Sequence, residues 1–286
     1  MDIKSVRAVY FSANGTTEKV TRAIAEGAAR SLDTNCGTTD FTLPSSRNQP
    51  LLFQPDELIV LGIWISAGRI PNLLLPFLEG MKGNGAIAVP VVLFGNRGYD
   101  DGLIELRDIL LRCGATPVAA AAFVGEHSFS PRIATERPDA KDLDAAKTFG
   151  HKVADMILKE NNPPVPVQVP GIPYPYRGYY QPLDEQGSPV RFLKAVPVTT
   201  DTCIDCKLCA DICPMGAIDR HNVSNIPGKC IKCCACIRQC PVKAKNFADP
   251  AFLSHLHMLE NTLTHRTESE YYPESCREVP LLPKRT

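Results

Sequence analysis

The chain lacks net charge and long apolar runs. Its 286 residues include 31 Lys and Arg against 31 Asp and Glu, so no overall field steers it toward nucleic acid or an anionic membrane. No apolar run approaches the ~18 residues of a membrane-spanning helix, and no signal peptide is visible at the N-terminus. Because 44% of the residues are hydrophobic and 22% are charged, we expect a folded, soluble, cytoplasmic protein.

Two common nucleotide-binding motifs are also missing. No segment follows the G-x-x-x-x-G-K-[ST] pattern, which argues against a nucleoside triphosphate held by a P-loop lysine. The only close glycine pair of the dinucleotide type is Gly83-Asn84-Gly85, and it precedes a strand-like segment instead of a helix. We therefore expect electrons to come from a protein donor and not from NAD(P)H.

Residues 1–160 do contain an alternation of strand-like and helix-like segments. Buried strands are predicted at Val6–Phe11, Leu58–Ile65, Ile87–Phe94 and Val118–Val124, with a weaker candidate at Thr38–Leu43. Helices are predicted at Thr16–Ser31, Asn72–Glu79, Gly102–Cys113 and Ala140–Lys159. This order predicts an α/β domain with a doubly wound, five-stranded parallel sheet, whose ligands bind beyond the carboxyl ends of the strands.

Residues 161–200 differ in composition, because nine of the 25 prolines lie there. Proline removes backbone donors and favours extended chain, so this region is interpreted as a stiff linker. Its four tyrosines are expected to pack it onto a domain surface. They are Tyr174, Tyr176, Tyr179 and Tyr180. Within the C-terminal extension 250–286, Pro250–His265 has the pattern of an amphipathic helix.

Nine of the 12 cysteines lie between Cys203 and Cys240. Without an export signal, clustered cysteines are more typical of metal ligands than of disulfides. The pattern Cys203-x-x-Cys206-x-x-Cys209-x-x-x-Cys213-Pro214 recurs 27 residues later as Cys230-x-x-Cys233-x-x-Cys236-x-x-x-Cys240-Pro241. This internal repeat resembles that of bacterial two-cluster ferredoxins, and the resemblance implies a small α+β ferredoxin domain at residues 201–249.

The spacing of the repeat predicts two [4Fe–4S] clusters. Three close thiolates let one loop wrap a cubane, while the fourth cysteine, followed by proline, ligates the other cluster, as in bacterial two-cluster ferredoxins. The two expected ligand sets are Cys203, Cys206, Cys209 and Cys240, and Cys230, Cys233, Cys236 and Cys213. Nearby isoleucines are expected to shield the clusters from water, which is one influence on their potential. They are Ile204, Ile212, Ile218, Ile231 and Ile237.

A structural zinc site is the alternative for these cysteines. Zinc ribbons use two Cys-x-x-Cys pairs for each ion and need no third cysteine three residues on, so zinc is disfavoured. Cys234 interrupts the pattern, but the 27-residue offset selects Cys233 as the ligand. Cys36, Cys113 and Cys276 are interpreted as unligated thiols.

The turn after the first strand, Ser12-Ala13-Asn14-Gly15-Thr16-Thr17-Glu18, leads into a helix. Hydroxyl groups, an amide and free backbone N–H groups at a helix N-terminus form a cradle for an anion. No Lys or Arg lies between Tyr10 and Glu18, so a phosphate monoester held by neutral donors fits best. An ordinary capped helix start is the alternative. The expected phosphate ligands are Ser12, Asn14, Gly15, Thr16 and Thr17.

This turn resembles the flavodoxin phosphate loop T-x-T-G-N-T-E. Ser12, Gly15, Thr17 and Glu18 stand at matching positions, whereas Asn14 and Thr16 depart from the pattern but keep hydrogen-bonding side chains. Two later segments match flavodoxin flavin loops in order and location. They are Trp64-Ile65-Ser66-Ala67-Gly68-Arg69 and Gly95-Asn96-Arg97-Gly98-Tyr99-Asp100-Asp101.

The resemblance implies FMN as a cofactor, with its ring held between these two loops. Tyr99 is then the candidate to stack on the ring, and Trp64 is an equal candidate for stacking or for the core. Gly95 and Gly98 would let the backbone approach the ring closely. Arg97 would lie near the pyrimidine edge or in solvent. His127, which follows the fifth strand, would approach the flavin or the cluster module, or serve only the structure.

Over nearly its whole length the chain resembles the flavodoxin–ferredoxin fusion proteins of anaerobic bacteria and archaea. The resemblance implies an electron-transfer protein that relays electrons among FMN, two clusters and redox partner proteins, because flavins join one-electron to two-electron chemistry. A ferredoxin-dependent flavin reductase and an iron–sulfur sensor or assembly protein with an empty scaffold are the alternatives. No catalytic acid–base pair stands out beyond His127, and the oligomeric state is open. The ferredoxin domain is expected to cover the flavin-bearing edge of its own sheet or, in a homodimer, that of a second subunit.

Overall fold

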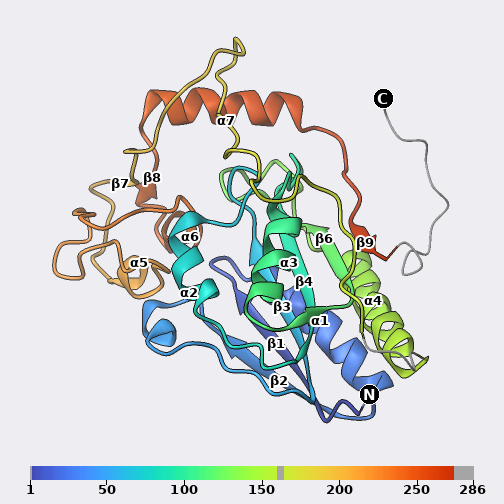
Figure 1. Cartoon of the computed structure of the whole chain (residues 1–286). Coiled ribbons are helices and arrows are strands. Elements are labelled where there is room, and N and C mark those ends of the chain that lie inside the picture. The colour runs from blue at the N-terminus through green and yellow to red at the C-terminus, as the bar shows by residue number, and fades with distance from the viewer. Residues whose placement is uncertain (1, 160–163, 274–286) are drawn as a thin grey trace.

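Five parallel strands form the centre of the molecule, and all but the exposed edge strand β2 are largely buried (Figure 1). The computed structural model describes residues 2–159 and 164–273. The sheet runs in the order β2-β1-β3-β4-β6, with the short β5 (Thr116–Pro117) beside the start of β4. The strands are β1 (Ser5–Phe11), β2 (Asn35–Asp40), β3 (Glu57–Trp64), β4 (Ile87–Phe94) and β6 (Ala120–Val124).

Helices cover both faces of the sheet, as the alternation predicts. Helices α1 (Thr16–Ser31) and α4 (Ala140–Lys159) share one core layer. Helix α3 (Gly102–Arg112), α2 (Leu75–Glu79) and the 3₁₀ turn η2 (Asn72–Leu74) cover the other face. Glycine allows α1 and α4 to pack closely: a Cβ at Gly150 would come within 2.1 Å of the Ile24 carbonyl oxygen.

The strand order is the flavodoxin-like 2-1-3-4-5 arrangement, and the predicted fold class is confirmed. The chain reverses its direction of winding between β1 and β3. Loops after β1, β3, β4 and β6 therefore meet at one edge, where ligands bind in such sheets. All three loops expected to hold FMN lie along this edge.

The sheet also carries a strand that the sequence did not predict. β9 (Glu270–Tyr272) pairs antiparallel with β6, so that Ala121 lies opposite Tyr271. It arrives from α7 (Pro250–Thr262), which ends three residues before the predicted end at His265. Strand β2 also differs, because it covers Asn35–Asp40 instead of Thr38–Leu43. The buried Phe41 belongs to the core but follows the strand.

The ferredoxin-type module is small and has little regular structure. Strands β7 (Val198–Thr199) and β8 (Lys245–Asn246) pair antiparallel. Two single-turn helices, α5 (Leu208–Asp211) and α6 (Ala235–Arg238), follow the closely spaced cysteines. Strand β7 lies within residues 161–200, the predicted linker, and pairs there with β8 of the module.

The proline-rich segment packs along the α/β domain. Tyr176 donates its hydroxyl to Asp108 at 2.9 Å, Tyr179 donates to the Ile70 carbonyl at 2.7 Å, and the Tyr180 N–H donates to the Ala67 carbonyl. The predicted packing is confirmed for these three tyrosines, whereas Tyr174 is 79% exposed. The segment is thus held directly against the loop after β3.

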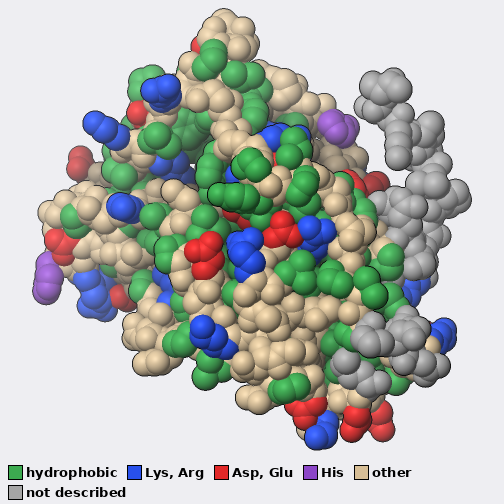
Figure 2. Space-filling view, in the orientation of Figure 1, with side chains coloured by type: hydrophobic (Ala, Val, Ile, Leu, Met, Phe, Trp, Pro, Cys, Tyr) green, Lys and Arg blue, Asp and Glu red, His purple; other side chains and the backbone are tan. Residues whose placement is uncertain are grey.

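The predicted domain boundaries at 160, 200 and 249 stay predictions. Residues 1, 160–163 and 274–286, including Cys276 and the end of the C-terminal extension, lie outside the described residues. None of the helices in the described part of the chain is both long and apolar enough to cross a bilayer. On the face seen in Figure 2, acidic and basic side chains are interspersed, consistent with the balanced composition.

Candidate functional site

The loop after β1 forms an open turn at the start of α1. Gly15 has φ of 81° and precedes the helix without a side-chain cap, and a Cβ placed on it would meet no atom within 4 Å. The first N–H groups of a helix lack intrahelical acceptors. Ser12 accepts a hydrogen bond from the Glu18 N–H at 3.0 Å, which attaches the loop to the first turn of α1. These features fit an anion cradle.

The remaining residues of this loop differ in exposure. Thr16 is half-buried, whereas Thr17 is buried against β3, where a Cβ on Gly62 would touch its methyl group at 3.1 Å. Asn14 directs its amide away from the loop and donates to the Cys233 carbonyl at 2.7 Å. Its role as a phosphate ligand stays a prediction.

The loop after β3 makes a tight turn in which Ser66 and Arg69 exchange backbone hydrogen bonds. A Cβ on Gly68 would come within 1.9 Å of the Asp100 carboxylate, so this glycine permits the close approach of the loop after β4. Trp64, at the end of β3, packs against the core and remains half-buried, as do Ile65 and Ala67.

The loop after β4 is held by other parts of the chain. The buried Asn96 donates to the carbonyls of Leu263 and His265 and accepts from the Thr267 N–H, and so binds the segment between α7 and β9. Arg97 pairs with Asp100 at 2.7 Å and lies 4.1 Å from the centre of the Tyr180 ring. The half-buried Gly98 has φ of 146°.

Tyr99 is buried in the core of the α/β domain. Its ring packs 5.3 Å from that of Phe94, and its hydroxyl donates to Glu270 at 2.9 Å and lies 3.1 Å from the Tyr272 hydroxyl. Burial and these partners raise the pKa of Tyr99. The structure thus gives Tyr99 a packing role beside β9, and its stacking on a flavin stays a prediction.

His127 lies beside the flavin loops. A Cβ on Gly95 would come within 2.5 Å of its ring, and its Nδ1 accepts from the Phe129 N–H at 3.1 Å. Burial, followed by the charges of His255, Arg238 and Arg97, lowers the pKa of His127 to about 4. The ring is therefore neutral at pH 7, with its proton on Nε2.

Two buried polar atoms test whether FMN fits between these loops. In the part of the chain that the structure describes, three buried side-chain polar atoms have no hydrogen-bond partner. Two of the three, Asn14 Oδ1 and Trp64 Nε1, belong to the loops expected to hold the flavin. A buried unpaired polar atom costs about 1–3 kcal/mol. An acceptor and a donor in need of partners fit the hydroxyls and carbonyls of FMN.

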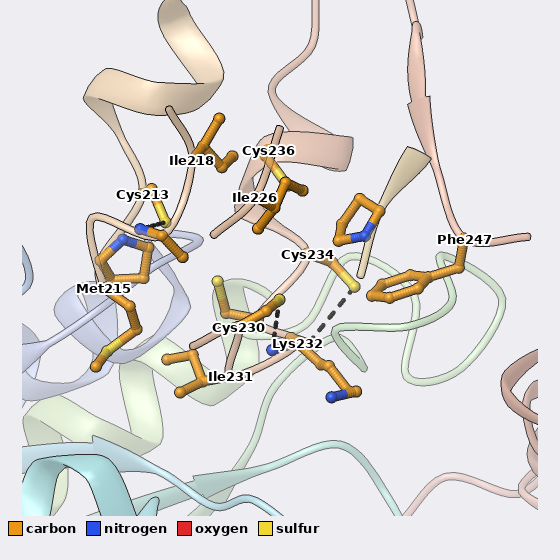
Figure 3. A pocket seen from close by; sticks show the side chains of 14 residues that line it. Cys213, Met215, Ile218, Ile226, Cys230, Ile231, Lys232, Cys234, Cys236 and Phe247 are labelled. Carbon is orange, nitrogen blue, oxygen red and sulfur yellow. Dashed lines mark hydrogen bonds between the residues drawn. The ribbon is translucent and has the colours of Figure 1, made fainter. Parts of the chain in front are cut away.

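The cysteines of the repeat form two separate groups, each lining its own cavity, and Cys234 lines the first cavity as well. The two ligand sets stay a prediction. One group, here called the proximal site, lines a cavity with Ile218, Ile226 and Phe247 (Figure 3). The other group, the distal site, lines a second cavity with Ile204, Val242 and Lys245. The proximal site is Cys213, Cys230, Cys233 and Cys236, and the distal site is Cys203, Cys206, Cys209 and Cys240.

Each group of cysteines lines a cavity of its own. The empty space of the two cavities, counted with their openings to solvent, is about 400 and 330 Å³. Nowhere in residues 2–159 and 164–273 do three Cys, His, Asp or Glu side chains gather in a way that would hold one metal ion. The choice of clusters over zinc therefore rests on the spacing of the cysteines.

The backbone repeats with the same 27-residue offset as the cysteines. Positive φ angles recur at Asp205 and Lys232, and at Lys207 and Cys234. Helix α6 follows α5 by 27 residues, and the N–H groups of Ala217 and Ala244 point at the sulfurs of Cys213 and Cys240. Hydrogen bonds to cluster sulfurs are one control on potential.

Cys234 occupies the helix-start position that Lys207 holds in the first copy. It is 5% exposed and packs in an aromatic cluster with Phe192, Phe247 and Phe252. This packing explains a ninth cysteine that is not needed as a ligand. Cys36 is exposed and Cys113 is half-buried, each remote from the other cysteines in the sequence.

The two sites differ in the thiol environment. Burial raises the pKa of both Cys233 and Cys236 to about 12. For Cys240, burial is outweighed by four backbone N–H groups, beginning with that of Ala244, and its pKa is lowered. A buried thiolate is costly without a partner, so the proximal thiolates depend more on a bound cation for their stability.

The proximal half of the module is docked on the flavin-loop edge. Arg238, on α6, forms an ion pair with Glu126 and donates to the carbonyls of His127 and Ser128. Gln239 donates to the Ala13 carbonyl at 3.2 Å, and Asn14 donates to Cys233. Sequence reasoning missed Arg238, because a single arginine after a cysteine carries no signal of its partner.

Comparison with known proteins finds a family model for a short part of the chain and several solved structures with weak likeness. The 4Fe-4S binding domain family matches residues 196–219, which contain the first cysteine copy. No curated protein matches the chain. A flavodoxin from the domain Archaea is 18% identical, covering 55% of this chain and 99% of its own, with a TM-score of 0.38. A flavodoxin of Streptococcus pneumonia TIGR4 is 16% identical, covering 53% and 99%, with a TM-score of 0.37.

A flavoprotein structure from Bacteroides uniformis is 14% identical, covering 56% of this chain and 100% of its own, with a TM-score of 0.32. At such values these likenesses add nothing to the strand order already described. The strand order and the family match together make the chain a flavodoxin-like α/β domain joined to a ferredoxin-type 4Fe-4S module.

Proposed function

We propose that the chain is an intramolecular electron relay with one FMN and two [4Fe–4S] clusters. The observation that carries this proposal is the hydrogen bond from Asn14, in the expected phosphate loop, to the carbonyl of Cys233, an expected cluster ligand. A relay requires its redox sites to lie close together, and a direct bond between their binding loops supports that closeness.

The docking of α6 supports the same proposal. Arg238 satisfies four acceptors of the loop after β6, and hydrogen bonds to charged groups are stronger than neutral ones. An Arg–carboxylate pair of limited exposure, 24% for Arg238 and 19% for Glu126, also fixes orientation. These contacts are the ones that the proposed self-docked arrangement requires.

The order of the sites follows from these contacts. The proximal site contacts the flavin loops through Asn14, whereas the distal site lies with Cys206 and Ile204 at the surface, Ile204 being 62% exposed. We propose that partner proteins exchange electrons at the distal site, and that the proximal site connects it to the flavin. FMN supplies one- and two-electron chemistry, and the clusters supply one-electron transfer.

The flavin ligands of the proposal are those in the three loops together with His127. Gly15 and Thr16 provide the cradle, and Asn14 Oδ1 and Trp64 Nε1 provide an acceptor and a donor. The neutral Nε2–H of His127 offers one more donor beside Gly95. A cytoplasmic, anaerobic setting and redox protein partners follow from the resemblance alone.

Cofactor analysis of anaerobically purified protein tests the proposal first. We expect about eight iron and eight sulfide for each chain together with FMN. Thr16→Asp should abolish flavin binding with the clusters intact, because its carboxylate would repel the phosphate. The variant should still fold, because acidic side chains are favourable at the start of a helix and Thr16 is the half-buried first residue of α1. Thr16→Ser is the matched control. Zinc without iron, or unchanged flavin affinity in Thr16→Asp, contradicts the assignment.

Single-cluster variants test the order of the sites. Reduction of the flavin by reduced clusters should be lost in Cys233→Ala and retained in Cys206→Ala, because only the proximal site adjoins the flavin loops. Stopped-flow absorbance of the chemically reduced protein measures this step. Equal flavin reduction when both clusters are removed would show that the chain is not a relay.

A further inference from the structure

Lys245 is a buried lysine at a position where the first copy of the repeat has isoleucine. It lies in β8 and is 3% exposed. The residue 27 positions earlier is Ile218, which is 8% exposed. Lys245 follows Cys240 by five residues, as Ile218 follows Cys213. The repeat thus replaces an apolar side chain by a cation in one of two otherwise matching environments.

The two residues line different cavities. Ile218 lines the proximal site together with Ile226 and Phe247 (Figure 3). Lys245 lines the distal site with its four cysteines. Burial raises the pKa of the Cys209 thiol, and the charge of Lys245 opposes that rise. The charge of Lys245 also opposes the rise in the pKa of Cys236 at the proximal site, so the ammonium group is close to both sites. Lys245 lines only the distal cavity, however, and we expect its effect to be larger there.

Lys245 has no carboxylate to neutralise it in the described part of the chain. Its ammonium donates to the Val223 carbonyl, which satisfies one of three N–H donors. Burying a charge without an opposite charge costs several kcal/mol. A cation retained in such a place points to an anionic group, and four thiolates around a cubane supply net negative charge that increases on reduction.

Other lysines near the sites are better solvated or already paired. Lys207, at the distal site, pairs with Asp205 at 2.6 Å. Lys232, at the proximal site, sends its ammonium to the Leu193 carbonyl, and Figure 3 shows it pointing away from Cys213 and Cys236. Lys232 lines the proximal cavity and its charge acts on Cys230, while Lys207 lines the distal cavity. Each site thus has one such lysine, and the more deeply buried Lys245 is the additional cation of the distal site.

We propose that Lys245 is the counter-charge that raises the reduction potential of the distal cluster above that of the proximal cluster. This inference rests on the proposed presence of two clusters. A nearby cation favours the reduced, more negative state of a cluster, and low dielectric strengthens the effect. The distal cluster is thus reduced first and retains a single electron, while the proximal cluster, in an apolar cavity, is the stronger reductant beside the flavin loops.

The test is a redox titration of the whole protein followed by electron paramagnetic resonance. Lys245→Ile gives this position the residue that the first copy has at Ile218. It should lower the higher of the two midpoint potentials by at least 59 mV, a tenfold change in the reduced-to-oxidised ratio for a one-electron couple. The lower midpoint should move less. Lys245→Arg keeps the charge and should retain the separation of the wild-type midpoints.

Lys194→Met is the charge control, because Lys194 is exposed and lines neither cavity, and it should leave both midpoints in place. If Lys245→Ile loses iron, Lys245→Met provides an unbranched apolar side chain with a similar shape. Unmoved midpoints in a variant with full iron content would overturn the role of Lys245, as would a shift confined to the lower midpoint. Wild-type protein without two clusters would instead overturn the proposed function.

Discussion

The two halves of the cysteine repeat share a backbone but differ in their surroundings. Cys233 and Cys236 of the proximal site are 8% and 9% exposed and adjoin the α/β domain, whereas Cys206 of the distal site is exposed. Lys245 lies in the distal cavity, and Ile218 takes its place in the proximal one. The comparison teaches that a repeat specifies ligand geometry, while packing against a neighbour gives each copy its own environment.

Replacement of Arg238 should have the largest effect on the difference between the two sites, because it weakens the docking of the proximal half. Arg238→Ala leaves Glu126 without its cation and the loop after β6 without a donor. Truncating such a pair costs about 2–3 kcal/mol, so docking becomes roughly 30- to 150-fold less favourable. We expect slower cluster-to-flavin electron transfer and faster proteolysis of the 164–200 segment.

Arg220→Ala is the control for this experiment. Arg220 pairs with Asp211 in the same module, but the two side chains are 67% and 46% exposed, and such surface pairs contribute little. Its electron-transfer rate should equal that of the wild type. If the Arg238→Ala variant stays docked and transfers electrons to the flavin as fast as the wild type, the apolar contacts alone position the module.

Iron removal by a chelator should also distinguish the two sites, with a smaller difference between them. Because Ile204 is 62% exposed and Val242 is 36% exposed, the distal site is poorly shielded. We expect iron to leave an oxidised sample in two phases of similar amplitude, the distal phase being about tenfold faster. Mass spectrometry after thiol alkylation should find Cys206 modified before Cys233. A single phase, or early modification of Cys233, contradicts the difference in shielding.

Because burial keeps His127 neutral in the folded protein, we expect the stability of the protein to depend on pH. Its folded pKa of about 4 lies below the value of ~6.5 in unfolded chains, so the unfolded state binds more protons between these values. Stability should therefore fall as the pH decreases from 6.5 to 4, by about 1–2 kcal/mol after allowing for solvent screening of this half-buried ring.

Thermal unfolding at several pH values, followed by circular dichroism, measures this dependence. His127→Asn, which cannot titrate, should show a flatter curve over the same range. His221→Asn is the control, because His221 is exposed in the distal half of the module. An identical slope in wild type and His127→Asn would contradict the role of burial.

The smallest effect is expected from the hydrogen bond between Asn14 and the Cys233 carbonyl. Asn14→Thr restores the residue of the resembled loop pattern and removes the bond to Cys233, which contributes about 1 kcal/mol. FMN affinity should then differ less between cluster-loaded and cluster-free protein, by about fivefold. Fluorescence titration of both forms measures this coupling, with Thr16→Ser as the control. Unchanged coupling would show that the loops act independently.

Much of the α/β domain was predictable from pattern alone. The predicted bounds of α1, β4 and α4 match the structure, because amphipathic helices and continuous apolar strands have strong local signals. Strand β2 was displaced by three residues, since it is a polar edge strand and the apolar Phe41 lies beyond its end. The three residues of β9 are a strand only because β6 offers an unpaired edge.

The sequence by itself determined the alternation of strands and helices, the fold class and the 27-residue repeat, because each depends on local periodicity or on spacing along the chain. Only the tertiary structure decided which copy adjoins the flavin loops, that Tyr99 is buried beside β9, and that Asn14 and Arg238 join the two domains. These contacts span up to 219 residues of sequence, and such long-range partners leave no mark in local patterns. The surroundings of each site are therefore a property of the folded chain.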